Sequence, residues 1–309
     1  MQEEEQEQKK NPKTEAKEAR SYKPSVFRES GRILYSHVRR NPFYLLAVGF
    51  VIAYLVYSAL AALFPQITGF DPNALNLNVA LHPPSLAYPF GTDNLGRNLL
   101  NRVMAGAPID AAIALIIVSF SFLFGALTGS IAGYYGGLVD EIIMRITDIF
   151  LAFPGIILAL AIAAALGPGL LNAVLALSVV WWPIYTRLAR GETLSVNSNQ
   201  FILAARASGL PRSKIVTRHI IPNVIAPMIA YATTDVGNVI ILFSVLGYLG
   251  LGAQPPLVDV GRLVYDGQNF IQSAPWYPII PGIVIFVIVI SFALVGDLIR
   301  DMLDPHWRI

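Results

Sequence analysis

Residues 199–222 read NQFILAARASGLPRSKIVTRHIIP, and this stretch decides how the chain is organised. It is polar and basic, has a core of small residues, and lies between two long apolar runs. The small residues leave a narrow helix face that can seat deeply in a groove, and Gly209 can end the helix with a left-handed residue. Pro211 then prevents simple continuation of that helix. This pattern indicates a docking element inside a membrane protein.

The composition is that of a membrane protein. Mean hydropathy is +0.57, and only 14% of the residues are charged, so much of the surface must face lipid. A net charge of +2 gives no sign of nucleic-acid binding, and the absence of Cys excludes disulfides and thiol chemistry. The four His lack the spacing of metal ligands. No phosphate-binding Gly-x-x-x-x-Gly-Lys-Ser/Thr loop and no catalytic constellation occur, so we expect neither ATP binding nor catalysis by this chain.

Six apolar segments are long enough to cross a bilayer as helices, which needs about 20 residues each. Residues 149–186 carry no charge, and Gly167-Pro168-Gly169 divides this run. The expected spans are 43–64, 111–138, 141–166, 170–188, 222–247 and 278–298.

Lys and Arg predict the orientation of these spans. Ten lie within residues 1–42, and others lie between the fourth and fifth spans and after the sixth. The opposite side has only Arg97, Arg102 and Arg262. The chain is therefore expected to be a multi-pass protein of the plasma (inner) membrane. Both of its termini and the stretch 199–222 are expected to lie in the cytoplasm. Residues 1–33 are charged and are predicted to be a disordered cytoplasmic tail, ahead of a transmembrane domain over 34–309.

Several long motifs carry a resemblance to a known family. They are FPQITGFDPN (64–73), YPFGTDNLGRNLLNRVMAGA (88–107), DIFLAFPGIILA (148–159), RLARGETLS (187–195), GYLGLGAQPP (247–256) and GDLIRDMLDP (296–305). In the stretch 199–222, Ala204-Ala205, Gly209 and Pro222 have the spacing of the cytoplasmic coupling loop of importer permeases. In this order, the motifs resemble permeases of the ABC dipeptide/oligopeptide importer family, and the C-terminal motif resembles the C-type subunit.

The resemblance implies an all-α polytopic protein of the type I importer permease fold, with six transmembrane helices. It implies an extracytoplasmic insert over 65–107 and a cytoplasmic coupling loop over 195–220. The chain would form half of the translocation pathway and be non-catalytic. Its partners would be a homologous second permease, two cytoplasmic ATPases, an extracytoplasmic substrate-binding protein and the lipid bilayer. The ATPases, not this chain, would bind ATP and Mg, so no cofactor is expected here.

Other functions stay open from the sequence. The same machinery in this family also imports oligosaccharides or nickel. An ATP-independent secondary transporter would normally show inverted repeats with broken helices, and an intramembrane enzyme would need a catalytic constellation. Neither feature is found in the sequence.

The resemblance assigns the ATPase contact to the coupling loop, where residues 199–216 are expected to form a short helix parallel to the membrane. The candidate coupling residues are Leu203, Ala204, Ala205, Arg206, Gly209, Arg212, Lys214 and His219. The family usually has Glu at the position of Leu203, so an apolar ATPase groove is expected opposite this side chain. The alternative is an ordinary basic inner loop.

Asp235 is the only acidic or basic residue between His219 and Asp259, and it lies near the middle of the fifth span. Carboxylates inside a membrane usually face a water-filled cavity or a partner. With Thr234 and Asn238 it is the candidate lining of the translocation pathway. The alternative is a hydrogen-bonded cluster between helices.

Asp93 and Arg97 are four residues apart and are predicted to form an ion pair on a short helix. This pair would either shape the outer face that receives the substrate-binding protein or stabilise its own loop.

Overall fold

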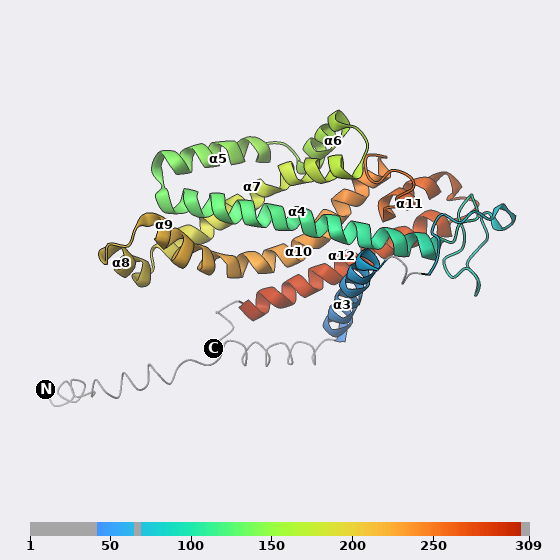
Figure 1. Cartoon of the computed structure of the whole chain (residues 1–309), viewed down its shortest axis with the longest axis horizontal. Helices are drawn as coiled ribbons and strands as arrows, with labels where there is room; N and C mark the ends of the chain where they lie inside the picture. Colours follow the sequence, from blue (N-terminus) through green and yellow to red (C-terminus); the bar gives the residue numbers. More distant parts are fainter. Residues whose placement is uncertain (1–41, 65–68, 304–309) are drawn as a thin grey trace, which may run out of the picture.

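Figure 1 shows the computed structural model, in which residues 42–64 and 69–303 are described. Within these residues the chain is helical, and its only β-type pairing is an isolated bridge between Thr92 and Asn98. The elements are α3 (Pro42–Leu63), η3 (Leu77–Val79), α4 (Leu99–Tyr135), α5 (Gly137–Leu151), α6 (Gly155–Leu166), α7 (Leu170–Asn197), α8 (Gln200–Ala207), α9 (Arg212–Ile215), η4 (Val216–Ile220), α10 (Ile221–Tyr248), α11 (Val260–Gly267), η5 (Gln268–Phe270) and α12 (Trp276–Leu303). The all-α fold is confirmed, and the proposed tail 1–33 lies outside the described residues.

Five stretches of helix are long and apolar enough to cross a membrane. They are Pro42–Leu63, Leu99–Tyr135, Leu170–Asn197, Arg212–Tyr248 and Trp276–Met302. α5 and α6 pass the same test only as a pair, and the pair is bent by 83°. If the bent pair forms one span, the described chain has the expected six.

The third expected span, 141–166, is therefore not one continuous helix. Pro154 lies in the break, and α6 begins directly after it. A proline has no N–H to donate, and it disfavours the helical conformation of the residue before it. The prediction of a single helix was wrong because the run 149–166 is uniformly apolar, and hydropathy alone does not show a change of direction.

α4 begins at Leu99 rather than at residue 111. The Asn98 side chain accepts a hydrogen bond from Leu100 N at 3.0 Å, which caps the helix. Arg102 and Asp110 fall inside its first turns and are only 4% and 1% exposed. These charged residues look like the edge of a span in the sequence, but here they are buried within a longer helix.

α4 and α7 lie side by side along their length (Figure 1), and glycines of α4 make their contact close. A Cβ on Gly125 would lie 2.4 Å from Tyr185 Cβ, and one on Gly129 would lie 2.3 Å from Thr186 O. One turn further, a Cβ on Gly133 would lie 2.8 Å from Thr193 Cβ. Small residues spaced by four allow such close approach between membrane helices.

The two ends of the helix bundle differ in composition. Figure 1 shows α8 and α9 at one end, which we call the basic end because the exposed residues Arg206, Arg212, Lys214 and Arg218 lie there. The opposite end carries residues 69–98 and α11, and we call it the insert end. The short helices η3 and α11 both lie at this end.

Candidate functional site

The side chains of α8 divide into a buried group and an exposed group. Ile202 and Ala205 are 0% and 8% exposed, so they hold α8 against the rest of the bundle. Phe201 and Leu203 are 44% and 52% exposed, and Ala204 is exposed beside them. The Ala pair is therefore split, because adjacent residues of a helix point in different directions. Only Ala204 is available to a partner, and Ala205 belongs to the packing of this chain.

Gly209 ends α8 as the sequence predicts. Its φ is 73°, its N–H donates to Arg206 O at 3.0 Å, and Leu210 N donates to Ala205 O at 3.3 Å. These two bonds and the left-handed residue form the glycine cap typical of helix C-termini. A Cβ at this position would meet nothing within 4 Å. The turn therefore requires glycine for its backbone conformation and not for space.

Pro211 separates α8 from α9 and also starts α9. Its carbonyl accepts from Lys214 N at 2.9 Å and from Ile215 N at 3.1 Å. The segment 199–216 is thus two short helices joined by a turn, and the expectation of one short helix was wrong. The turn reverses the chain because Gly209 and Pro211 impose backbone conformations that a single helix cannot contain.

The second half of the coupling loop is continuous with the fifth span. α9, the π-helical segment η4 and α10 together form one helical stretch from Arg212 to Tyr248. Pro222 lies inside this stretch just after the π-helical segment η4, and such a local π adjustment accommodates a proline, which has no N–H to donate. Ile215 and Ile220 are 1% and 0% exposed and fix this stretch against the bundle. α9 and α10 are therefore parts of one continuous helical stretch.

The basic residues of the loop are exposed and lack acidic partners in the described part of the chain. Arg206, Arg212, Lys214 and Arg218 are exposed, and none forms an ion pair with a residue of 42–64 or 69–303. His219 is half-buried, and its carbonyl accepts from Asn223 Nδ2 at 2.6 Å. Exposed charges without internal partners are available to acidic groups of another molecule.

Asp235 does not face a cavity of this chain. It is 1% exposed, and its Oδ2 accepts from Trp181 Nε1 at 2.5 Å and from Tyr185 Oη at 2.9 Å. Its Oδ1 accepts from Asn238 Nδ2 at 3.3 Å. These contacts enclose the carboxylate between α7 and α10, which favours the alternative of a hydrogen-bonded cluster between helices. The sequence did not reveal Trp181 and Tyr185 as partners, because they lie on α7, about fifty residues away.

Thr234 and Asn238 differ in their surroundings. Thr234 packs against α12, since a Cβ on Gly296 would lie 1.9 Å from Thr234 Oγ1. Asn238 is exposed, and Tyr231 and Ile241 on the same helix face are 37% and 41% exposed. Residues at these spacings share one side of a helix. This open side of α10 contains Asn238 but excludes the Asp235 carboxylate.

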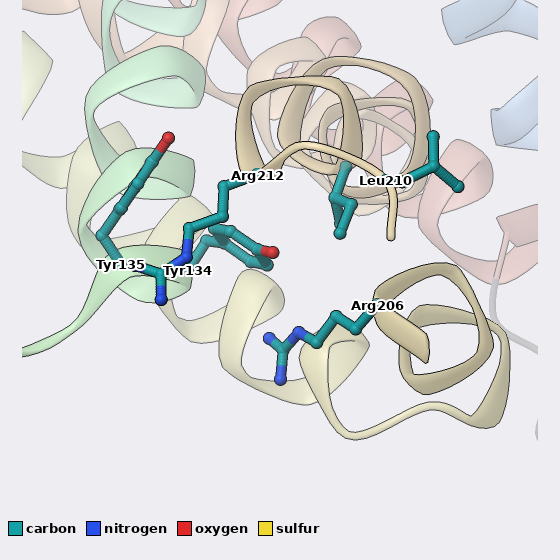
Figure 2. Close-up of a pocket in the computed structure, with 6 residues that line it drawn as sticks. Tyr134, Tyr135, Arg206, Leu210 and Arg212 are labelled. Atoms are coloured by element: carbon teal, nitrogen blue, oxygen red, sulfur yellow. The ribbon is translucent and has the colours of Figure 1, made fainter. Parts of the chain in front are cut away.

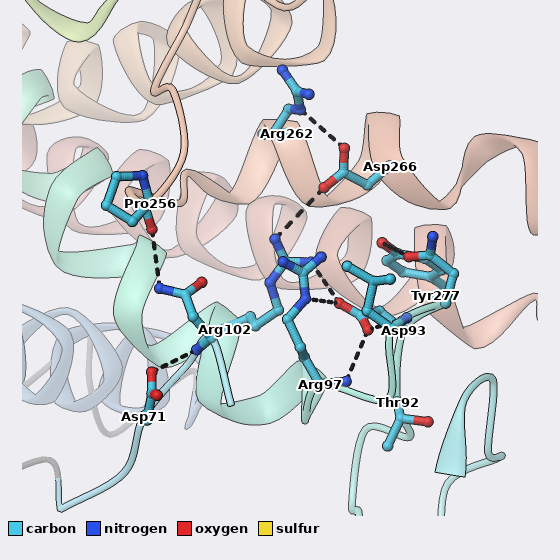
Figure 3. Close-up of polar contacts among 12 residues, drawn as sticks. Asp71, Thr92, Asp93, Arg97, Arg102, Pro256, Arg262, Asp266 and Tyr277 are labelled. Atoms are coloured by element: carbon cyan, nitrogen blue, oxygen red, sulfur yellow. Dashed lines mark hydrogen bonds and ion pairs between the residues drawn. The ribbon is translucent and has the colours of Figure 1, made fainter. Parts of the chain in front are cut away.

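Five charged side chains at the insert end form one cluster of ion pairs, as Figure 3 shows. Asp93 Oδ2 lies 2.6 Å from Arg97 Nε and 2.8 Å from Arg102 Nη1. Asp266 joins the cluster at 3.6 Å from Arg102 Nη2 and 2.9 Å from Arg262 Nε. The predicted Asp93–Arg97 pair is confirmed, although it lies in a turn and not on a helix. The cluster ties residues 93–97 to α4 and α11, which favours loop stabilisation.

A second acidic group at this end caps α11. Asp259 Oδ1 accepts from Arg262 N at 2.6 Å, and its Oδ2 accepts from Ala253 N at 2.9 Å. Its neighbour Val260 donates to Asp110 Oδ2 of α4 at 3.2 Å. Burial raises the pKa of Asp259 to about 6, although the two backbone N–H donors and Arg262 oppose this shift. Burial at the insert end therefore favours the protonated form of this carboxylate.

Comparison with known proteins agrees with this architecture. Residues 125–309 match the family described as "Binding-protein-dependent transport system inner membrane component". A dipeptide transport system permease protein, DppC of Alkalihalophilus pseudofirmus, is 38% identical over 90% of each chain. A probable D,D-dipeptide transport system permease protein, DdpC of Escherichia coli, is 42% identical over 78% of this chain and 81% of its own.

A solved structure shares the fold. The inward-facing MetNI methionine ABC transporter contains a chain that superposes with a TM-score of 0.54 at 20% identity, covering 66% of this chain and 97% of its own. The family match spans more than half of the sequence, and relatives of 38% and 42% identity cover most of it. The chain therefore belongs to the family of binding-protein-dependent transport system inner membrane components.

Proposed function

We propose that this chain is the C-type permease subunit of an ATP-driven importer of dipeptides or oligopeptides. Its family consists of inner membrane components of binding-protein-dependent transport systems. Relatives with 36–42% identity are named as permeases of dipeptide or peptide transport systems, and one with 37% identity is named for glutathione, itself a peptide. These names support peptides over the nickel and oligosaccharide alternatives.

The single observation that carries the mechanism is the continuous helical stretch from Arg212 to Tyr248. A partner ATPase would dock on the exposed side of α8, where Leu203 and Ala204 are available, while Arg206, Arg212 and Lys214 meet its acidic groups. ATP and Mg would be bound by two such ATPases. When they close on ATP, α8 and α9 move, and α10 moves with them because no flexible loop separates α9 from α10.

A second, homologous permease would complete the pathway, and an extracytoplasmic binding protein would deliver the peptide at the insert end. The basic end would lie in the cytoplasm, which agrees with the positive-inside rule. The open side of α10, with Asn238 beside Tyr231, would border the path. Asp235 then acts indirectly, because its carboxylate orients Asn238 at 3.3 Å while it holds α7 against α10.

Substitution of Gly209 tests the coupling mechanism. In reconstituted vesicles with the ATPases, sister permease and binding protein, Gly209→Val should lower peptide uptake per ATP hydrolysed. A left-handed φ costs an ordinary residue about 1–2 kcal/mol, so the turn between α8 and α9 would change conformation. Gly209→Asn is the matched control, since Asn tolerates this conformation and space is available.

The expected result is a several-fold loss of uptake per ATP for Gly209→Val and near-normal coupling for Gly209→Asn, with both proteins inserted at normal levels. Equal, normal coupling in both variants would contradict the mechanism. Uptake of nickel or an oligosaccharide, with none of peptides, would contradict the cargo while leaving the permease role intact.

A further inference from the structure

A cavity at the basic end contains Arg206 and Arg212, two of the residues proposed above to meet the ATPase. Figure 2 shows it between the C-terminal end of α4 and the turn that joins α8 to α9. Its volume is about 410 Å³, within the range of roughly 300–1,000 Å³ typical of small-molecule sites. The lining residues are Tyr134, Tyr135, Arg206, Leu210, Arg212 and Ile215. Two guanidinium groups and two phenols are thus combined with no carboxylate in the lining.

Arg206 is held in place within this cavity. Its guanidinium carbon lies 5.1 Å from the centre of the Tyr134 ring, which is a cation–π contact. Its Nη2 also donates to Asn197 Oδ1 at the end of α7. Tyr134 is only 9% exposed and is therefore itself fixed by packing. A guanidinium that is oriented in advance loses less side-chain entropy when it binds an anion.

Arg212 enters the cavity from the opposite wall, at the start of α9 (Figure 2). Neither arginine forms an ion pair with any residue of 42–64 or 69–303. Elsewhere at this end, by contrast, Arg187 and Arg190 pair with Asp148 and Asp140. The cavity therefore holds two positive charges that this part of the chain does not neutralise.

We propose that this cavity binds a phosphate group. Guanidinium groups match phosphate oxygens with paired, charge-assisted hydrogen bonds. Tyr134 and Tyr135 end the membrane-spanning helix α4, and tyrosines are enriched where such helices meet lipid headgroups. The phosphate would belong either to an anionic phospholipid or to a free phosphate ion. Because the cavity joins α4 to the coupling loop, its occupant would hold the turn at Gly209 in a fixed position.

The full-length chain, purified in a neutral detergent, permits a direct test. Binding of phosphatidylglycerol, phosphatidylcholine and inorganic phosphate is measured separately by native mass spectrometry and by a thermal-shift titration. The test protein is the double variant Arg206→Gln/Arg212→Gln. The matched control is Lys214→Gln/Arg218→Gln, which removes the same charge from the same segment but leaves the cavity lining intact.

The expected result is that phosphatidylglycerol binds the natural protein and the control about equally, and binds the test variant at least about tenfold more weakly, because charge-assisted hydrogen bonds are lost. Competition by inorganic phosphate at the same site assigns recognition to the phosphate group alone. If inorganic phosphate does not compete and phosphatidylglycerol binds more tightly than phosphatidylcholine, recognition is assigned to the anionic lipid.

Two results would overturn the proposal. In the first, both double variants weaken binding equally, so that only the general positive charge of the loop attracts the probes. In the second, neither probe binds the natural protein measurably, while Arg206→Gln/Arg212→Gln loses association with the ATPase. The cavity would then receive an acidic side chain of that partner.

Discussion

The insert end and the basic end of this molecule differ in the burial and pairing of their charged side chains. At the insert end, Asp93 is 0% exposed and Arg102 is 4% exposed, and they are paired with each other. At the basic end, the arginines and the lysine of the coupling loop are exposed and unpaired within the described residues. A buried charge must find its partner inside the chain, whereas an exposed one can be matched by another protein. The contrast indicates a rigid frame at one end and a contact surface at the other.

The contrast is sharpest for Arg102. Arg102→Leu should lower the free energy of unfolding by about 3–5 kcal/mol, because it leaves a buried carboxylate with one partner fewer. Thermal unfolding of the purified chain measures this. Arg145→Leu is the control: its pair with Glu141 is 76% and 57% exposed and should contribute only about 0.3–0.5 kcal/mol. Similar losses in the two variants would remove the distinction between buried and exposed pairs.

Asp259 gives the insert end a dependence on pH. Its folded pKa of about 6 is raised above the usual value by burial, so the folded state binds the proton more tightly than the unfolded state. The contribution of Asp259 to the free energy of unfolding is about 1–3 kcal/mol. It is fully present below about pH 4 and is lost as pH rises through 6. Asp259→Asn should remove this decline between pH 4 and 7. An unchanged pH profile in the variant would show that another group causes it.

In the middle of the bundle, Asp235 is buried and Asn238 is exposed. Asp235→Ala should lower stability by about 1–3 kcal/mol, because Trp181 and Tyr185 lose their acceptor. Asn238→Ala should change stability by no more than about 0.5 kcal/mol, as surface changes usually do, and yet lower peptide uptake. A stability loss confined to Asn238→Ala would reverse the assignment of buried and exposed roles.

Leu203 has the smallest expected effect on the chain itself. Leu203→Glu should change the stability of the isolated permease by less than about 0.5 kcal/mol, because the side chain is half-exposed. In the complete transporter it should lower uptake, since it would bury an unpaired charge in an apolar groove of the ATPase. Leu203→Met is the control and should transport normally. Equal or faster uptake with Glu would mean that the groove is polar.

Hydropathy and charge predicted much of this fold. The apolar runs identify the spans beginning near 43, 170 and 278 to within a few residues, because lipid requires long apolar helices. The same signal misplaced the start of α4, since Arg102 and Asp110 are buried by tertiary contacts that a local window does not contain. Pro154 marks the place of the 83° bend, but hydropathy does not show how large the bend is.

The end of α8 was easier to predict than the residues around Asp235. Gly209 and Pro211 act through their own backbone conformations, so a local pattern is sufficient. The environment of Asp235 depends on which side of α10 meets α7, and this is determined by the close packing of distant helices. A lone acidic residue in a span indicates a polar contact, and it does not tell whether the contact is water or a neighbouring helix.

The most direct test of the central claim uses the absence of cysteine from the natural chain. Leu203→Cys introduces a single thiol on the exposed side of α8, and a thiol-specific photo-crosslinker attached to it in the assembled transporter reports its neighbour. Leu86→Cys, at a fully exposed position of the insert end, is the matched control. A coupling role predicts a crosslink from position 203 to the ATPase and no crosslink from position 86 to the ATPase. Crosslinking of position 203 to the binding protein, or to no partner in an actively transporting complex, would contradict it.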